Sequence, residues 1–317
     1  MKDNFPLWPA FFLLLLPGCA PKPESFYTTG DLKGFMIAYT ALLDEEKGDY
    51  EVFVMNPDGT GQKNISNWEG VDWAYYTCQD KIYFLSDRDT CHHCYLLYET
   101  DTDGNIRKVT NFLMADSQMS ARKAGQELIV RPKATLDSAF YIINLQGEIL
   151  KKIYPGLAYL NDPCFSPDGK QVVFRGSKTP RSKDNENHID ELFIMDDDGK
   201  NLRQLTHYPA TDTTARWYNY HAGPPHWAPR DNLLTFSSFQ KKKETLFAIQ
   251  PDGKGLRQLW PGGYHDWSPN QRHMAYGLEG ADGNFDIWLI GANGNGNHRL
   301  TTDSLFEHGP LFVKVEK

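Results

Sequence analysis

The sequence lacks an excess of positive charge. Its 33 Lys and Arg residues stand against 41 Asp and Glu residues, so the 317-residue chain has a formal net charge of −8. A surface of that sign repels phosphate backbones and anionic lipid, and we therefore expect no nucleic-acid partner. The Gly-x-Ser-x-Gly motif is also absent. A serine hydrolase of the nucleophile-elbow type is therefore not expected.

No apolar run is long enough to cross a bilayer, which takes about 20 residues. The longest run, Pro6–Leu16, has 11 residues and follows Lys2. It ends in Leu16-Pro17-Gly18-Cys19, which resembles a bacterial lipobox. We predict a lipoprotein signal peptide over residues 1–18, lipidation of Cys19, and a flexible tether over 19–34. An ordinary signal peptide or a short membrane anchor is the alternative.

Cysteine is scarce, with five residues in all. An exported chain meets oxidising conditions, so Cys91 and Cys94 are expected to form a small disulfide loop or to stay as free thiols. With the intervening His92 and His93, the same cysteines could instead bind Zn²⁺. Cys78 and Cys164 are interpreted as small apolar residues within strands.

What the sequence does contain is a sixfold repeat. In each copy a short apolar strand leads into a turn that ends in glycine, and a second short strand follows. The six glycines are Gly59, Gly104, Gly147, Gly199, Gly253 and Gly294, which lie 45, 43, 52, 54 and 41 residues apart by subtraction. Short strands that repeat with a period in the forties are typical of a β-propeller with one blade per repeat.

The repeats predict an all-β fold, a six-bladed β-propeller of four-stranded antiparallel blades over residues 35–317. The first repeat opens at Phe35 without an innermost strand, and the strand-like segment Gly309–Lys314 has no blade of its own. We expect this segment to pair with the first blade, because that pairing removes two free strand edges and closes the ring.

Two segments carry a resemblance to a known family. Phe165–Phe174 and Leu192–Thr206 resemble the WD40-like repeat of the TolB propeller family. The resemblance covers residues 35–317 and implies a six-bladed propeller. TolB has a further N-terminal domain before its blades, and this chain has only the predicted tether there. A role in the Tol–Pal system is therefore not carried over.

The long connections are expected on one end of the ring, called here the top face, and the glycine turns on the other. The two longest are Ser177–Asp190 and His207–Pro225. Loops that deviate from a repeat commonly carry binding sites. The candidate partner-binding residues are Arg216, Trp217, Tyr218, Tyr220 and His221. Neutral insertion drift is the alternative.

A second candidate site lies where the innermost strands begin. His226, His265, Asp266 and His308 are expected to converge on the axial funnel. They could bind a divalent metal ion, act as general bases, or bond only backbone groups and water. No other cofactor is predicted.

The leading functional hypothesis is a non-enzymatic, lipid-anchored module of the cell envelope, at the outer membrane. It would be monomeric and would bind an envelope protein or a glycan through its top face. A second hypothesis is a metal-dependent lyase, because some TolB-like propellers resemble oligogalacturonide lyases; His226, His265, His308 and Arg216 would then form the site. A third is a purely structural subunit, which the fold alone does not distinguish from the first.

Overall fold

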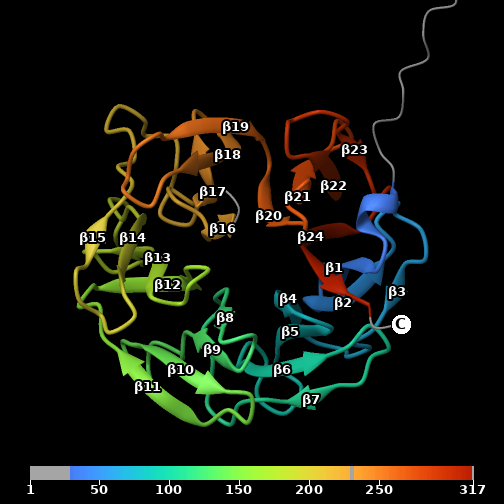
Figure 1. The fold of residues 1–317 in the computed structure, drawn as a ribbon, viewed down its shortest axis with the longest axis horizontal. Helices are drawn as coiled ribbons and strands as arrows, with labels where there is room; N and C mark the ends of the chain where they lie inside the picture. Colours follow the sequence, from blue (N-terminus) through green and yellow to red (C-terminus); the bar gives the residue numbers. More distant parts are fainter. Residues whose placement is uncertain (1–28, 229–231, 316–317) are drawn as a thin grey trace, which may run out of the picture.

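The computed structural model describes residues 29–228 and 232–315. Six four-stranded antiparallel sheets are arranged radially around a central axis, as Figure 1 shows. The only helical element in the described part of the chain is a single 3₁₀ turn, η1 (Thr29–Leu32). The predicted fold class is therefore confirmed.

The first three blades follow the order of the chain, apart from one strand. From the axis outward, blade 1 contains β24 (Phe306–Lys314), β1 (Phe35–Asp44), β2 (Asp49–Met55) and β3 (Lys63–Asn64). Blade 2 contains β4 (Asp72–Cys78), β5 (Lys81–Ser86), β6 (Leu96–Thr100) and β7 (Arg107–Lys108). Blade 3 contains β8 (Ser120–Arg122), β9 (Glu127–Val130), β10 (Phe140–Asn144) and β11 (Ile149–Ile153).

The remaining three blades have the same arrangement. Blade 4 contains β12 (Tyr159–Phe165), β13 (Gln171–Ser177), β14 (Glu191–Asp196) and β15 (Arg203–Gln204). Blade 5 contains β16 (His226–Ala228), β17 (Leu233–Gln240), β18 (Lys243–Ile249) and β19 (Arg257–Pro261). Blade 6 contains β20 (Gly263–Trp267), β21 (His273–Glu279), β22 (Phe285–Gly291) and β23 (His298–Arg299).

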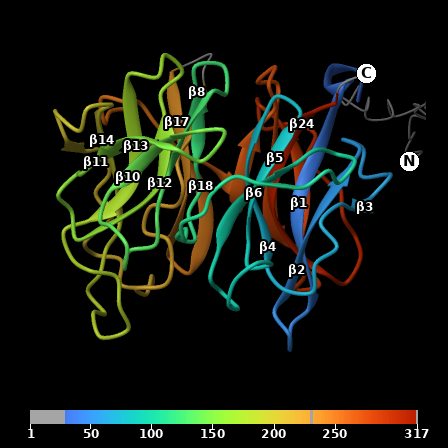
Figure 2. The same ribbon diagram turned by 90° about the horizontal axis from the view of Figure 1, so that it is seen from below.

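The ring closes as predicted, because the last strand completes the first blade. β24 pairs antiparallel with β1, from Phe35 opposite Lys314 to Leu42 opposite Phe306. The strand begins at Phe306, three residues before the predicted Gly309. Side views place β24 and β1 next to each other (Figure 2). One sheet thus joins the two ends of the propeller and leaves neither as a free edge.

The N-terminal boundary differs from the prediction. Leu32, within the predicted tether, is 2% exposed and packs in a hydrophobic cluster with Ile37, Tyr39 and Ile287. An apolar side chain buried between blades 1 and 6 does not belong to a flexible linker, so the predicted tether cannot extend through Leu32 to residue 34. The predicted signal peptide and Cys19 lie outside the described residues. Within residues 29–228 and 232–315, no helix is long and apolar enough to cross a membrane.

The six repeat glycines occupy turns that require them. Each has a positive φ, between 80° and 93°, which side chains with a Cβ rarely adopt. Five of the six also lie against the preceding blade. A Cβ on Gly147 would lie 2.0 Å from the carbonyl oxygen of Val109, and one on Gly59 would lie 2.4 Å from that of Leu300. Gly294 has no atom within 4 Å of such a Cβ. The repeat thus encodes contacts between blades as well as turns.

In four blades a hydrogen bond joins the third strand to a hydroxyl side chain two residues after the end of the fourth strand. In each case a backbone N–H of the third strand donates to a Ser or Thr Oγ. The pairs are Val52 to Ser66 (2.8 Å), Leu97 to Thr110 (3.0 Å), Leu192 to Thr206 (2.8 Å) and Ile287 to Thr301 (3.0 Å). All four hydroxyls are buried, so each bond satisfies a donor that water does not reach.

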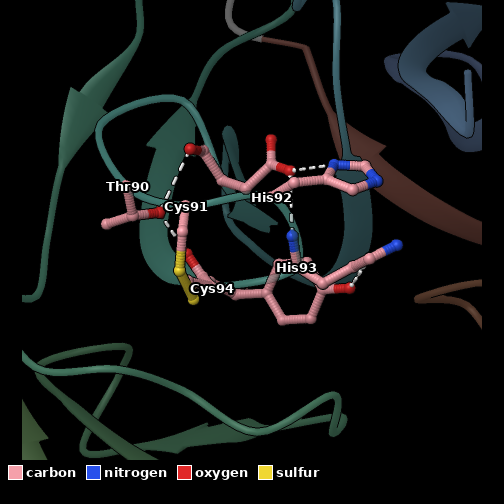
Figure 3. Close-up of a disulfide and its surroundings, with 7 residues drawn as sticks. Thr90, Cys91, His92, His93 and Cys94 are labelled. Atoms are coloured by element: carbon pink, nitrogen blue, oxygen red, sulfur yellow. Dashed lines mark hydrogen bonds and ion pairs between the residues drawn. A yellow bond between two sulfur atoms is a disulfide. The ribbon is translucent and has the colours of Figure 1, made fainter.

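Cys91 and Cys94 form a disulfide in the connection between β5 and β6, with Cα atoms 5.1 Å apart (Figure 3). His92 Nδ1 lies 3.0 Å from Asp87 Oδ2, and the rings of His92 and His93 are 3.9 Å apart. The disulfide alternative is therefore the one observed, and its sulfurs are not thiolates that could bind zinc. Cys78 and Cys164 are free and pack beside hydrophobic clusters, as predicted.

Candidate functional site

A cavity of about 490 Å³ opens on the axis at the top face, and we call it the funnel. Its lining residues come from the first three strands of the blades, counted from the axis, or from the connections between strands. The funnel is lined by Tyr50, Trp73, Tyr75, Asp116, Gln118, Asp162, Arg175, Arg181, Tyr218, Asn219, Tyr220, Pro224, Phe239, Glu244, Tyr264, Phe306 and His308. Every blade borders it, so the site exists only in the closed ring.

Four inner strands carry a β-bulge, and in three of them the bulge residue lines the funnel. The strand register shifts at Tyr75 in β4, at Asp162 in β12 and at Tyr264 in β20. A bulge inserts one extra residue and re-aims its side chain, and all three of these residues line the funnel. Asp162 and Tyr264 also have positive φ values of 53° and 39°. Non-glycine residues in this region are strained, and such strain concentrates at functional sites.

Aromatic rings form a continuous arc along one wall. Trp73 lies 5.4 Å from Tyr50, and Tyr50 lies 6.2 Å from His308, measured between ring centroids. The arc continues from His308 to Tyr264 at 5.2 Å and from Tyr264 to Tyr220 at 6.0 Å. Burial lowers the pKa of His308 to about 4, so its imidazole is neutral at neutral pH. The arc is therefore an uncharged aromatic surface, in which three of the four ring contacts are edge-to-face.

A buried ion network supports the end of the arc at Tyr220. Arg175 lies between two carboxylates, with its Nη2 2.6 Å from Asp162 Oδ2 and its Nη1 3.1 Å from Asp190 Oδ2. Its guanidinium carbon lies 4.5 Å from the centre of the Tyr220 ring. Burial opposes ionisation of Asp190, but Arg175 and His221 together hold the pKa of Asp190 below its ordinary value. The network joins blade 4 to the loop that carries Tyr220.

Three charged side chains of the lining lack a partner of opposite charge. Among residues 29–228 and 232–315, no cation forms an ion pair with Asp116 or Glu244, and no carboxylate pairs with Arg181. Arg181 donates instead to the backbone oxygens of Trp217 (3.2 Å) and Tyr218 (3.1 Å). The Tyr75 hydroxyl donates to Asp116. Burial raises the pKa of Glu244 above its ordinary value.

The five predicted partner-binding residues differ in whether they line the funnel, lie at its rim or are buried. Tyr218, 59% exposed, and Tyr220 line the funnel. Arg216 is exposed at the rim, 3.8 Å from Glu186, and the Trp217 backbone oxygen holds Arg181. His221 is only 5% exposed, and its Nδ1 lies 3.2 Å from Asp190 Oδ1. His221 therefore anchors the loop, and it offers no surface to a partner.

The structure brings three of the four predicted metal-binding residues together, with the His226 and His265 rings 4.5 Å apart, and places His308 elsewhere. His226 and Asp266 border a second axial cavity of about 220 Å³ below the funnel, whereas His308 lines the funnel itself. His265 is buried, and its Nε2 lies 2.7 Å from Thr235 Oγ1. His226 Nδ1 lies 3.9 Å from Asp266 Oδ1. In the part of the chain that the structure describes, no group of three His, Cys, Asp or Glu side chains could hold a metal ion. The metal site stays a prediction without geometric support.

Most of the funnel lining was missing from the sequence prediction. Tyr50, Trp73, Tyr75, Tyr264 and Glu244 lie within strands that the repeat marks as structural. One signal was readable: Pro163 follows Asp162 inside an inner strand, where proline is tolerated mainly at a bulge. Nothing comparable marks Tyr75 or Tyr264.

Comparison with known proteins informs on the fold only. No protein-family profile matches the chain, and no curated protein is similar to it in sequence. Among solved structures, TolB from Acinetobacter baumannii superposes with a TM-score of 0.68 at 14% identity, covering 88% of this chain and 67% of that one. A putative TolB from Agrobacterium tumefaciens gives 0.61 at 14% identity, with 89% and 99% covered.

A third similar structure belongs to a protein with a different name. Kuenenia stuttgartiensis hydrazine synthase gives a TM-score of 0.61 at 14% identity and covers 89% of this chain but 47% of that one. Identities this low carry the architecture and not the activity. The TolB resemblance of the repeats and the superposition on two TolB structures agree: the chain has the TolB-like six-bladed propeller fold.

Proposed function

We propose that this protein is a non-enzymatic binding module of the bacterial cell envelope, which holds a protein or glycan partner in the funnel on its top face. The observation that carries the proposal is the funnel itself. It combines a large concave volume, a continuous aromatic arc and charged groups without counter-ions, and ligand sites are typically of this kind. Tyr and Trp side chains combine an apolar ring with a hydrogen-bonding group, so they can contact both protein and sugar partners.

The exposed rim supports the same face as the contact surface. Tyr218 is 59% exposed, Phe306 is 40% exposed, and both border the funnel. Large apolar side chains that gather around a cavity are typical of an interaction site, whereas single exposed ones are common on any surface. The opposite face carries the six short glycine turns, and five of the six glycines there lie against the preceding blade.

The envelope location rests on the lipobox-like Leu16-Pro17-Gly18-Cys19 segment. We propose that Cys19 is lipidated and that the acyl chains alone attach a monomeric propeller to the outer membrane. Replacing Cys19 with Ser should move the full-length protein from the membrane fraction to the soluble fraction. A C19S protein that stays in the membrane fraction would mean that another segment anchors the chain.

Site-specific photo-crosslinking in living cells tests the face assignment. A photoreactive amino acid is placed at Tyr218 on the top face or at Leu256, which is 51% exposed in the turn between β18 and β19. Because that turn lies at the other end of the blade, the two positions form a matched pair. We expect a discrete adduct from position 218 and none from 256. Adducts from 256 alone, or from neither position, would reject the proposal.

The lyase hypothesis is not pursued. It needs His226, His265 and His308 around one ion. The His226 and His265 rings are 4.5 Å apart, but His265 Nε2 is engaged by Thr235, and His308 lines the funnel and not the lower cavity. Arg216 pairs with Glu186 at the rim and is not part of the funnel lining.

A further inference from the structure

We propose that the group held in the funnel is an ammonium group, carried by an organic cation. This inference rests on the proposed binding function and names the chemistry of the ligand. Three features lead to it. The first is the uncharged aromatic arc, and the second is a pair of carboxylates without a cationic partner. The third is that both arginines of the lining already bind acceptors of the protein itself.

The aromatic arc is a row of rings in the funnel lining without a charge of its own. Trp73, Tyr50, His308, Tyr264 and Tyr220 follow one another at centroid distances from 5.2 to 6.2 Å. The ring quadrupole attracts a cation placed within about 6 Å of the ring centroid, and sites for quaternary ammonium groups are lined in this way. Arg175 already shows the interaction within the structure, because its guanidinium lies over Tyr220.

Asp116 and Glu244 add negative charge to the same cavity. Both line the funnel, and neither forms an ion pair within residues 29–228 and 232–315. Asp162 also lines it but is bound by Arg175. A carboxylate that is not neutralised by the protein favours a cationic ligand, above all where burial weakens screening by water.

The two arginines do not convert the funnel into an anion site. Arg175 is shared by Asp162 and Asp190, so that group is negative overall. Arg181 is turned to the rim loop, where two backbone oxygens accept its N–H groups. Counting the lining alone, three carboxyl groups (Asp116, Asp162 and Glu244) against two guanidinium groups (Arg175 and Arg181) give a formal charge of −1 when all five are ionised.

Calorimetric titration of the full-length protein with two isosteric ligands tests the inference. Choline and 3,3-dimethylbutan-1-ol share one shape, but only choline is charged. Glucose serves as the neutral sugar. We expect choline to bind at least about fivefold more tightly than the neutral alcohol. Equal binding of the two, preference for the alcohol or glucose, or no binding of choline would each overturn the inference.

Two variants locate the effect. Glu244→Gln keeps the size of the side chain and removes its charge, so choline affinity should fall by about three- to tenfold while affinity for the alcohol stays the same. Glu186→Gln is the matched control, because Glu186 is 61% exposed at the rim and does not line the funnel. Thermal melting verifies that both variants fold. Equal losses of affinity in the two would mean a general charge effect and would reject the site.

Failure of the ammonium inference can be distinguished from failure of the proposed binding function. Crosslinking at Tyr218 reports a partner on the top face whatever its charge, whereas the two isosteres report only the chemistry of the funnel. A crosslinked partner with no preference for choline would refute the ammonium inference and leave the binding module intact. If choline is preferred, glucosamine and Nα-acetyl-lysine amide, each compared with its neutral analogue, distinguish an amino sugar from a lysine side chain as the source of the group.

Discussion

The guanidinium of Arg175 stacks on the ring of Tyr220 at 4.5 Å, and this contact links the interior of blade 4 to the rim of the funnel. Arg175 is 2% exposed and is held by Asp162 on β12 and by Asp190 before β14. Asp190 in turn accepts hydrogen bonds from the backbone N–H and Nδ1 of His221. The loop 207–225 is thus fixed at its base by buried charges, which orients the aromatic residue next to His221.

Arg175→Ala should therefore be strongly destabilising. Removing one member of a buried ion network leaves the others uncompensated, and the expected loss is about 3–5 kcal/mol in the free energy of unfolding. Arg175→Lys should lose less, because it keeps the charge but not the planar fork. Urea unfolding measures both. Arg216→Ala is the control, since Arg216 is 62% exposed and should change stability by less than about 1 kcal/mol. An R175A protein as stable as R216A would contradict the account.

Gly147→Ala should destabilise the protein more than Gly294→Ala. The two glycines have nearly equal φ values, 80° and 81°, so alanine suffers the same backbone strain at both, about 1–2 kcal/mol. Only at Gly147 would the new methyl group meet a backbone atom, the Val109 oxygen at 2.0 Å. We expect an additional loss of about 1–3 kcal/mol at 147, measured by thermal or urea unfolding. Equal losses would show that the turn, and not the contact between blades, explains the repeat glycine.

Truncation after His308 should open the ring. It removes the part of β24 that contains Leu311, Phe312 and Val313, which are buried against β1 and the neighbouring blades. A chain that ends at Val315 keeps the whole strand and is the control. Limited proteolysis and melting should show loss of the cooperative unfolding of the control. A truncated protein with unchanged melting temperature would disprove closure by this strand.

Glu307 should make the protein less stable as the pH rises. It is 1% exposed, and burial raises its pKa from 4.5 to about 8. Between these values the folded chain retains a proton that the unfolded chain has released, so its contribution to stability falls as pH increases. Glu307→Gln removes this dependence, and the variant should gain about 2–4 kcal/mol relative to the wild type between pH 5 and pH 8.

Urea unfolding at both pH values measures that difference. Glu51 and Asp266 also have raised pKa values, each about 7 because of burial, so the absolute pH dependence reports several groups. The informative quantity is the E307Q difference from wild type. A difference that stays constant from pH 5 to pH 8 would mean that Glu307 is ionised throughout.

The sequence by itself determined the number of blades, their strand order and the closure of the ring. Each blade is a local unit, in which a strand, a glycine turn and an apolar residue a few positions later recur at short range. Gly59 and Leu300 illustrate the reason, because the repeat residues of one blade contact those of the next and a closed ring satisfies all of them. Even the missing inner strand of blade 1 was legible, as an extra strand at the end of the chain.

Only the tertiary structure decided the functional surface. The funnel takes residues from six blades, and no local pattern states which of them meet. The bulges at Tyr75 and Tyr264 change which way a side chain points without a sequence signal, and His221 is buried because Asp190, 31 residues earlier, binds it. His226 and His308 occupy similar positions in their repeats, yet they line different cavities, because a site at the axis depends on the depth at which each inner strand enters the ring.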